Sequence, residues 1–227
     1  MKKMFLIALM GIFVAASASA QSYRDSRYER DRSGRINYGS TFLSKTAYIG
    51  FRIGPAFTSF RSEDDLVDET SSKTGLNVGI AAGLSLSSEQ PLFLESGLYY
   101  TEKGAKLDAG GYDYRFSVNY LEIPIVFKYC YAFDEHTSIE PFLGGYFALG
   151  VSGKAKDYVL KESHSVYGSG SPVEFKHGDA GIRIGVGGSY DMFYAELLYD
   201  LGLANVCDNE YDSTHNGAFM LNFGVNF

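Results

Sequence analysis

The sequence predicts an all-β protein, a closed antiparallel eight-stranded transmembrane up-and-down β-barrel. Three observations predict it. The 227 residues include 26 Gly, 18 Tyr and 17 Phe, and Gly is better tolerated in strands and turns than in helices. Apolar and small or polar residues alternate with a period of two in segment after segment. The charged residues of these segments fall on one face only. The composition, 45% hydrophobic and 21% charged, excludes a disordered or collagen-like chain.

The N-terminal residues are predicted to lie outside the barrel. Residues 1–20 contain Lys2 and Lys3, an apolar stretch and a small-residue end at Ala18-Ser19-Ala20, as in a secretory signal peptide cleaved after Ala20. Residues 21–45 carry five arginines among Tyr, Ser, Asp and Glu without a period. We interpret them as a flexible periplasmic tail. Residues 46–227 are the predicted outer-membrane β-barrel domain.

Each predicted strand sets aliphatic and aromatic residues on one face and small or polar residues on the other. In the first strand Ile49, Phe51 and Ile53 share a face opposite Gly50 and Arg52. The eight strands are expected at residues 47–54, 75–85, 92–101, 120–129, 139–149, 181–187, 193–201 and 218–227.

The charges of these strands favour a barrel with an apolar exterior. All lie on the face that carries the Gly, Ala and Ser residues, and they are Arg52, Glu95, Glu122, Lys128, Glu140, Arg183, Glu196 and Asp200. A charge facing lipid costs roughly 2–4 kcal/mol at the bilayer midplane, so a charge-free face on every strand is expected of a membrane exterior. The polar faces then line a crowded interior.

The connections support the same topology. The gaps after the first, third, fifth and seventh strands are long, and those after the second, fourth and sixth are short. Such alternation is typical of transmembrane barrels, with long loops outside the cell and short turns in the periplasm. Because unpaired backbone groups are not tolerated in lipid, the last strand is expected to pair with the first.

Several motifs resemble the outer-membrane protein β-barrel domain family of Gram-negative envelopes, often called porin family proteins. They include the Asn-Tyr-Leu-Glu-Ile-Pro run at residues 119–124, Tyr-Tyr-Thr-Glu-Lys-Gly at 99–104, Glu-Pro-Phe-Leu-Gly at 140–144 and the terminal Asn-Phe-Gly-Val-Asn-Phe at 222–227. The resemblance spans about residues 45–227. It implies an eight-stranded barrel in the cell outer membrane, inserted by the barrel-insertion machinery, and it implies no catalytic residues.

The narrow lumen of an eight-stranded barrel is filled by its own side chains. We therefore expect the eight inward charges to form an ion-pair network that fills the lumen. The predicted function is a structural or interaction role through the extracellular loops. A small passive pore is the alternative, followed by a lipid-modifying outer-membrane enzyme and a soluble lipocalin-like binder.

No pattern predicts catalysis, a cofactor or a metal site. The four histidines, at 136, 164, 177 and 215, lack the spacing of a catalytic arrangement or of metal ligands. Cys130 and Cys207 are expected at opposite ends of the barrel, too far apart for a disulfide, so both thiols are expected to react without reduction. We predict that the protein is not an enzyme.

The predicted partners are outer-membrane lipid, the insertion machinery during assembly, and an unidentified ligand of the loops. A sequence pI near 5.1 argues against nucleic acid, which requires a basic face. The residues Leu221, Phe223, Val225 and Phe227 share one face of the last strand. They resemble the C-terminal signal that the insertion machinery reads.

Overall fold

The computed structural model describes residues 47–62, 70–86, 90–109, 112–134, 136–157, 162–165, 176–206 and 214–227. The predicted signal peptide, the tail and Cys207 lie outside these residues. The described part of the chain contains no helix long and apolar enough to cross a membrane.

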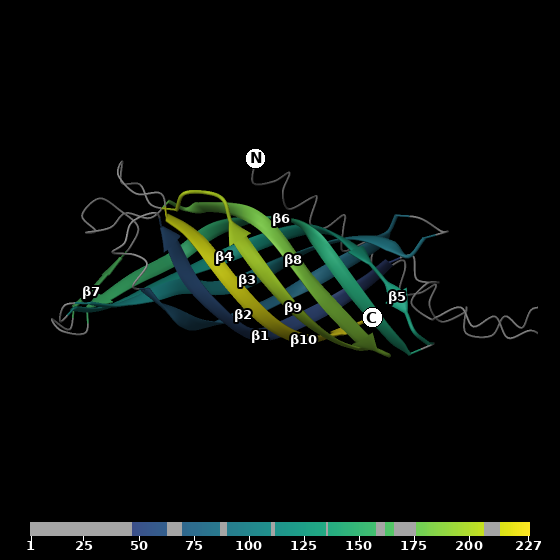
Figure 1. Ribbon diagram of the computed structural model, residues 1–227. Coiled ribbons are helices and arrows are strands. Elements are labelled where there is room, and N and C mark those ends of the chain that lie inside the picture. Colours follow the sequence, from purple (N-terminus) through teal and green to yellow (C-terminus); the bar gives the residue numbers. More distant parts are fainter. Residues whose placement is uncertain are drawn as a thin grey trace, which may run out of the picture.

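Eight strands form a closed antiparallel barrel, as predicted. They are β1 (Ala47–Ser62), β2 (Thr70–Ser85), β3 (Leu92–Ala109), β4 (Tyr112–Tyr129), β6 (Thr137–Asp157), β8 (Gly178–Tyr190), β9 (Phe193–Gly202) and β10 (Thr214–Asn226). Two short strands, β5 (Tyr131–Ala132) and β7 (Glu162–Ser165), pair with β6. Figure 1 shows the barrel strands running obliquely side by side, with β7 at one end and β5 and the C-terminus at the other.

Closure depends on the pairing of the first strand with the last. Residues Gly50 to Ser62 of β1 pair with Asn226 to Thr214 of β10, which confirms the predicted contact. The other barrel strands pair in chain order, including β4 with β6. We call the end with β5, the short turns and Phe227 the turn end, and the end with β7 the loop end.

Alternation along the strands produces an apolar exterior and a polar interior. On β6, Ile139, Leu143, Phe147 and Leu149 are exposed, whereas Glu140 and Tyr146 are buried. On β4, Phe127 is 55% exposed beside Lys128 at 1%. In water a row of exposed aromatic and aliphatic side chains would be costly, but in lipid it is the favoured surface.

The strands extend further toward the loop end than the sequence predicted. The third and fourth were expected to end near Thr101 and to begin near Tyr120, but β3 continues to Ala109 and β4 begins at Tyr112. Only residues 110–111 separate them, so the predicted long connection after the third strand is wrong. Outside lipid a strand can be polar on both faces, and the pattern of period two in hydrophobicity therefore stops at the membrane boundary.

An apolar cluster fills the lumen near the loop end. It contains Phe60, Val118 and Tyr120 together with Val206 from the segment after β9. The backbone N–H of Val206 donates to the carbonyl of Thr214 at 2.9 Å and its carbonyl accepts from Lys176 at 2.8 Å. This segment therefore folds into the barrel mouth and is held there by backbone hydrogen bonds.

Candidate functional site: the charged lumen

Ten charged side chains are buried among the described residues. The structure places all eight sequence-predicted charges inside the barrel. It adds two residues that the sequence analysis missed, Lys103 of β3 and Asp179 of β8. The sequence did contain a sign of Lys103, because this residue continues the inward positions of the third strand by steps of two. These positions are Glu95, Gly97, Tyr99 and Thr101. The predicted third strand ended one step too early.

The ten charges fall into two groups of five. The loop-side cluster is Lys103, Glu122, Asp179, Arg183 and Asp200. The turn-side cluster is Arg52, Glu95, Lys128, Glu140 and Glu196. Each cluster therefore holds two basic groups and three carboxyl groups.

The loop-side cluster is built around a forked arginine contact. Arg183 donates from Nε to Asp200 Oδ1 and from Nη2 to Asp200 Oδ2, both at 2.7 Å. The same Nη2 donates to Glu122 Oε2 at 2.9 Å. A bidentate guanidinium–carboxylate pair is among the strongest hydrogen-bonded pairs in proteins. Arg183 thus links β8 to β9 and to β4 across the lumen.

Lys103 completes this cluster from the third strand. Its Nζ lies 2.7 Å from Glu122 Oε1, 3.4 Å from Asp179 Oδ2 and 3.9 Å from Asp200 Oδ2. Asp179 Oδ2 also accepts from Asn216 Nδ2 at 2.8 Å and from the Tyr146 hydroxyl at 3.2 Å. A single ammonium therefore contacts three carboxylates, each of which has a second donor.

The turn-side cluster is built around Lys128. Its Nζ lies 2.7 Å from Glu95 Oε2, 2.8 Å from the Tyr194 hydroxyl and 3.7 Å from Glu140 Oε2. The Tyr48 hydroxyl donates to Glu95 as well. Ser138 Oγ donates to Glu140 and Asn222 Nδ2 donates to Glu196, at 2.8 and 2.9 Å.

Arg52 is held less tightly than Arg183. Its guanidinium carbon lies 3.9 Å from the centre of the Tyr194 ring, and Nη1 is 3.1 and 3.3 Å from the carbonyls of Phe51 and Val225. The nearest carboxylate contact, Nη2 to Glu95 Oε2, is 3.9 Å. Within the described residues, Nε and Nη2 have no hydrogen-bond partner. Stacking on an aromatic ring and hydrogen bonds to two backbone carbonyls, and not a carboxylate fork, therefore hold this cation.

Glycine makes room for the aromatic rings in the turn-side half. A Cβ on Gly83 would lie 2.2 Å from the Tyr48 ring, and one on Gly187 would lie 2.1 Å from the Tyr194 hydroxyl. Any larger residue would clash at either position. The two tyrosines lie over these glycines and reach Glu95 and Lys128 from there.

Three histidines, His136, His177 and His215, form structural contacts. His177 Nδ1 lies 3.1 Å from the Gly150 carbonyl, and His215 Nδ1 lies 3.0 Å from the Ala204 carbonyl. His136 Nδ1 lies 2.6 Å from Asp191 Oδ1 and joins two turns at the turn end. Within the described residues, no group of three His, Cys, Asp or Glu residues could hold a metal ion.

Cys130 follows the last residue of β4 at the turn end. Its thiol is free and buried, and it packs with Tyr48 and Phe93. Burial raises the pKa of the thiol to about 11. The expectation that Cys130 reacts without reduction stays a prediction. The reaction should be slow in the folded protein, because the thiolate is the reactive form.

The fold and the lumen together define a membrane-type barrel with an apolar exterior and a charged, filled interior. A family model described as "Outer membrane protein beta-barrel domain" matches residues 19–208. The chain belongs to this family, as its motifs predicted, and it is a protein of the outer membrane. The soluble lipocalin-like alternative is therefore excluded.

Similar solved structures are small barrels of the same kind. Ail, the attachment invasion locus protein of Yersinia pestis, is 13% identical with a TM-score of 0.43, covering 80% of this chain and 99% of Ail. Neisserial surface protein A is 16% identical with a TM-score of 0.44, covering 80% and 97%. OprG of Pseudomonas aeruginosa is 8% identical with a TM-score of 0.49, covering 80% and 96%. No curated protein matches the chain.

Proposed function

We propose that this protein is a closed, non-conducting barrel that acts in the envelope through structure and through binding at its loop end. The observation that carries this proposal is the filled lumen. Two ion-paired clusters lie across the barrel between the turn end and the apolar cluster around Val206. Buried charges are stable when they are paired and hydrogen-bonded, so this interior favours a plug over a permanent water-filled path.

Electrical recording tests this proposal directly. The refolded full chain is reconstituted in a planar lipid bilayer, and we expect no steady conductance steps. The control is a double variant, Arg183→Ala with Lys103→Ala, which removes both cations of the loop-side cluster. Steady unitary steps from the folded wild-type protein would support the passive pore instead.

The described residues include no arrangement typical of catalysis. His136, His177 and His215 contact backbone carbonyls or one carboxylate of a turn, and these contacts do not form a nucleophile–base pair. We therefore propose that the protein is not an enzyme. Deletion of single connections at the loop end, followed by binding and envelope-integrity assays, would identify the connection that matters.

We also propose that the outward face of β10 is the signal for membrane insertion. Phe223 and Phe227 are exposed there, with Leu221 and Val225 half-buried on the same face. Deleting Phe227 should lower the amount of folded, heat-modifiable protein in the membrane. Phe193→Ala is the matched control, because Phe193 is 61% exposed at the same end against 64% for Phe227. Equal membrane levels of both variants would contradict the proposal.

The N-terminal processing remains a prediction with a simple test. We propose export by a signal peptide cleaved after Ala20. The first residue of the mature protein should then be Gln21, which N-terminal sequencing of membrane-extracted protein would determine.

A further inference from the structure

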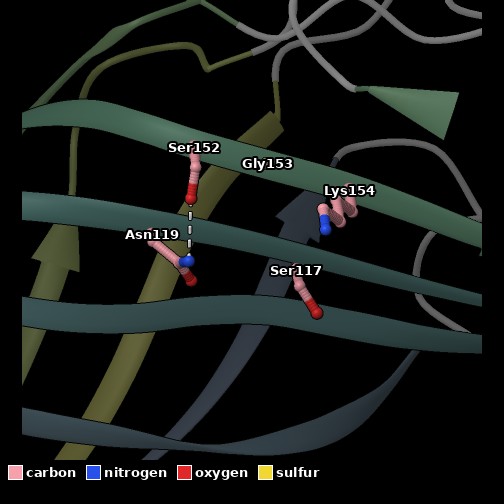
Figure 2. Close-up of a pocket in the computed structure, with 5 residues that line it drawn as sticks. All are labelled: Ser117, Asn119, Ser152, Gly153 and Lys154. Atoms are coloured by element: carbon pink, nitrogen blue, oxygen red, sulfur yellow. Dashed lines mark hydrogen bonds between the residues drawn. The ribbon is translucent and has the colours of Figure 1, made fainter.

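A shallow pocket of about 240 Å³ lies on the outward side of the barrel between β4 and β6, toward the loop end. Ser117 and Asn119 line it from β4, and Ser152, Gly153 and Lys154 line it from β6. Figure 2 shows the hydrogen bond from Asn119 Nδ2 to Ser152 Oγ, which measures 2.9 Å and joins the two strands. Its lining side chains are an amide, two hydroxyls and an ammonium, a set suited to a polar ligand.

A β-bulge creates this pocket. Asn119 pairs with Ser152, but the next residue, Tyr120, pairs with Gly150. Val151 is therefore the extra residue on β6. A bulge shifts the alternation of side chains on its strand. Ser152 and Lys154 are consequently exposed, whereas the intervening Gly153 is buried.

The pocket lies at the edge of the apolar band of the barrel. On β4 the outward series toward the loop end reads Ile125, Ile123, Leu121, Asn119 and Ser117. Apolar side chains therefore give way to polar ones within one step. On β6, Leu149 is the last exposed leucine before the bulge. The boundary of an apolar band is where lipid headgroups contact a membrane barrel.

Basic residues gather around the pocket on three adjacent strands. Lys106 of β3 pairs with Arg115 of β4, which pairs with Lys156 of β6, and Ser117 pairs with Lys154. Acidic residues occupy neighbouring positions in the register. Glu102 pairs with Asn119, and its Oε2 accepts from the Leu76 N–H at 3.3 Å, while Asp108, Asp113 and Asp157 lie further toward the loop end. Glu102 thus lies in the row nearest the apolar edge, and the basic residues occupy the next two rows, which contain Lys154 and then Lys106, Arg115 and Lys156.

We propose that this pocket binds the phosphorylated saccharide headgroup of a lipid in the surrounding leaflet. Lys154 contacts a phosphate, because an ammonium is a strong donor to phosphate oxygens. Asn119, Ser152 and Ser117 bind the hydroxyl groups of the sugar. The acyl chains of the same lipid lie against the apolar band beside Leu121 and Leu149. This inference rests on the outer-membrane location and is independent of the proposed non-conducting lumen.

Native mass spectrometry of the folded full chain, released from detergent micelles, tests this proposal. The probes are diphosphoryl lipid A, its dephosphorylated form, and inorganic phosphate as a competitor. The test variant is Lys154→Glu, and the matched control is Lys176→Glu, which makes the same charge change at another exposed lysine near the loop end. Heat-modifiable migration on a gel establishes that each variant is folded.

We expect the affinity for diphosphoryl lipid A to fall about tenfold in Lys154→Glu, the usual scale for loss of a charged hydrogen bond, and to stay within about twofold of wild type in Lys176→Glu. If inorganic phosphate competes with diphosphoryl lipid A in wild type but not in Lys154→Glu, the pocket binds phosphate through Lys154. This result would support the same anion chemistry, with free phosphate as the ligand. Equal affinity of wild type and Lys154→Glu, or equal binding of dephosphorylated lipid A, would overturn the proposal.

Discussion

The two lumen clusters have the same formal composition but different geometry. Each holds two basic groups and three carboxyl groups. In the loop-side cluster Arg183 forms a forked pair with Asp200 at 2.7 Å. In the turn-side cluster Arg52 stacks on Tyr194, and its nearest carboxylate oxygen is 3.9 Å away. Charge counting alone therefore does not reveal which cation holds the barrel together.

This difference follows from the neighbours that each strand supplies. Asp200 of β9 pairs directly with Arg183 of β8, so the two side chains start from adjacent positions on the same face. Arg52 pairs with Gly79 and Gly224 on its two sides, and neither offers a carboxylate. A cross-strand partner of opposite charge is thus the feature that separates the tight cluster from the loose one.

The largest expected effect is that of Arg183→Met. It would leave Asp200 buried without its forked donor and Glu122 with Lys103 alone, and breaking a buried ion pair costs about 3–5 kcal/mol. The measurement is the free energy of unfolding in urea for the barrel in lipid vesicles. Arg183→Lys should lie between the variant and wild type, because lysine keeps the charge but cannot form the fork. Unchanged stability of Arg183→Met would remove the distinction between the two clusters.

Lys103→Met should destabilise the barrel by about 3 kcal/mol, since three carboxylates lose a shared ammonium. Adding Glu122→Gln should recover about 1 kcal/mol or more of that loss, because the effects of two residues in contact do not add. Lys103 Nζ and Glu122 Oε1 are 2.7 Å apart. A double-mutant cycle in urea measures this coupling. Strictly additive effects would show that Lys103 acts on packing only.

Arg52→Met should have a smaller effect, about 1–2 kcal/mol, because a cation–π contact and two hydrogen bonds to backbone carbonyls are lost, but no carboxylate fork. The same urea titration applies. Arg52→Lys should restore little of the loss, since the planar stack on Tyr194 requires a guanidinium. A loss as large as that of Arg183→Met would mean that ring stacking holds a buried arginine as firmly as a carboxylate fork.

The smallest effect is expected outside the lumen, at the exposed turn between β5 and β6. The backbone N–H groups of His136 and Thr137 donate to Asp134 at 2.8 and 2.7 Å, and these hydrogen bonds hold its pKa below the ordinary value. A lowered folded-state pKa stabilises the protein above the unfolded pKa, and this contribution is lost as the pH falls through the folded pKa.

Asp134→Asn should therefore be slightly less stable than wild type at pH 7. The difference in unfolding free energy between the two proteins should become smaller below about pH 4. Urea midpoints of both proteins across this range provide the measurement. A gap that is independent of pH would assign the effect to the shape of the turn and not to its charge.

The sequence alone predicted much of the fold, because alternation reports directly on lipid contact. Charges on the outward face are excluded by solvation cost, so eight inward charges could be listed before their partners were known. Lys103 and Asp179 were missed because they lie where the outward residues are no longer apolar. The same limit hid the long polar extensions of β3 and β4.

The sequence by itself determined the faces of the strands and the polar content of the lumen, because these follow from a local period of two. It also indicated the order of the strands, through the connection lengths and the need to close the barrel. Only the tertiary structure decided the stagger between strands. That stagger brings Arg183 opposite Asp200, leaves Arg52 on an aromatic ring and places the bulge at Val151. Register is a property of a pair of strands and of the turn that joins them, and no single strand segment encodes it.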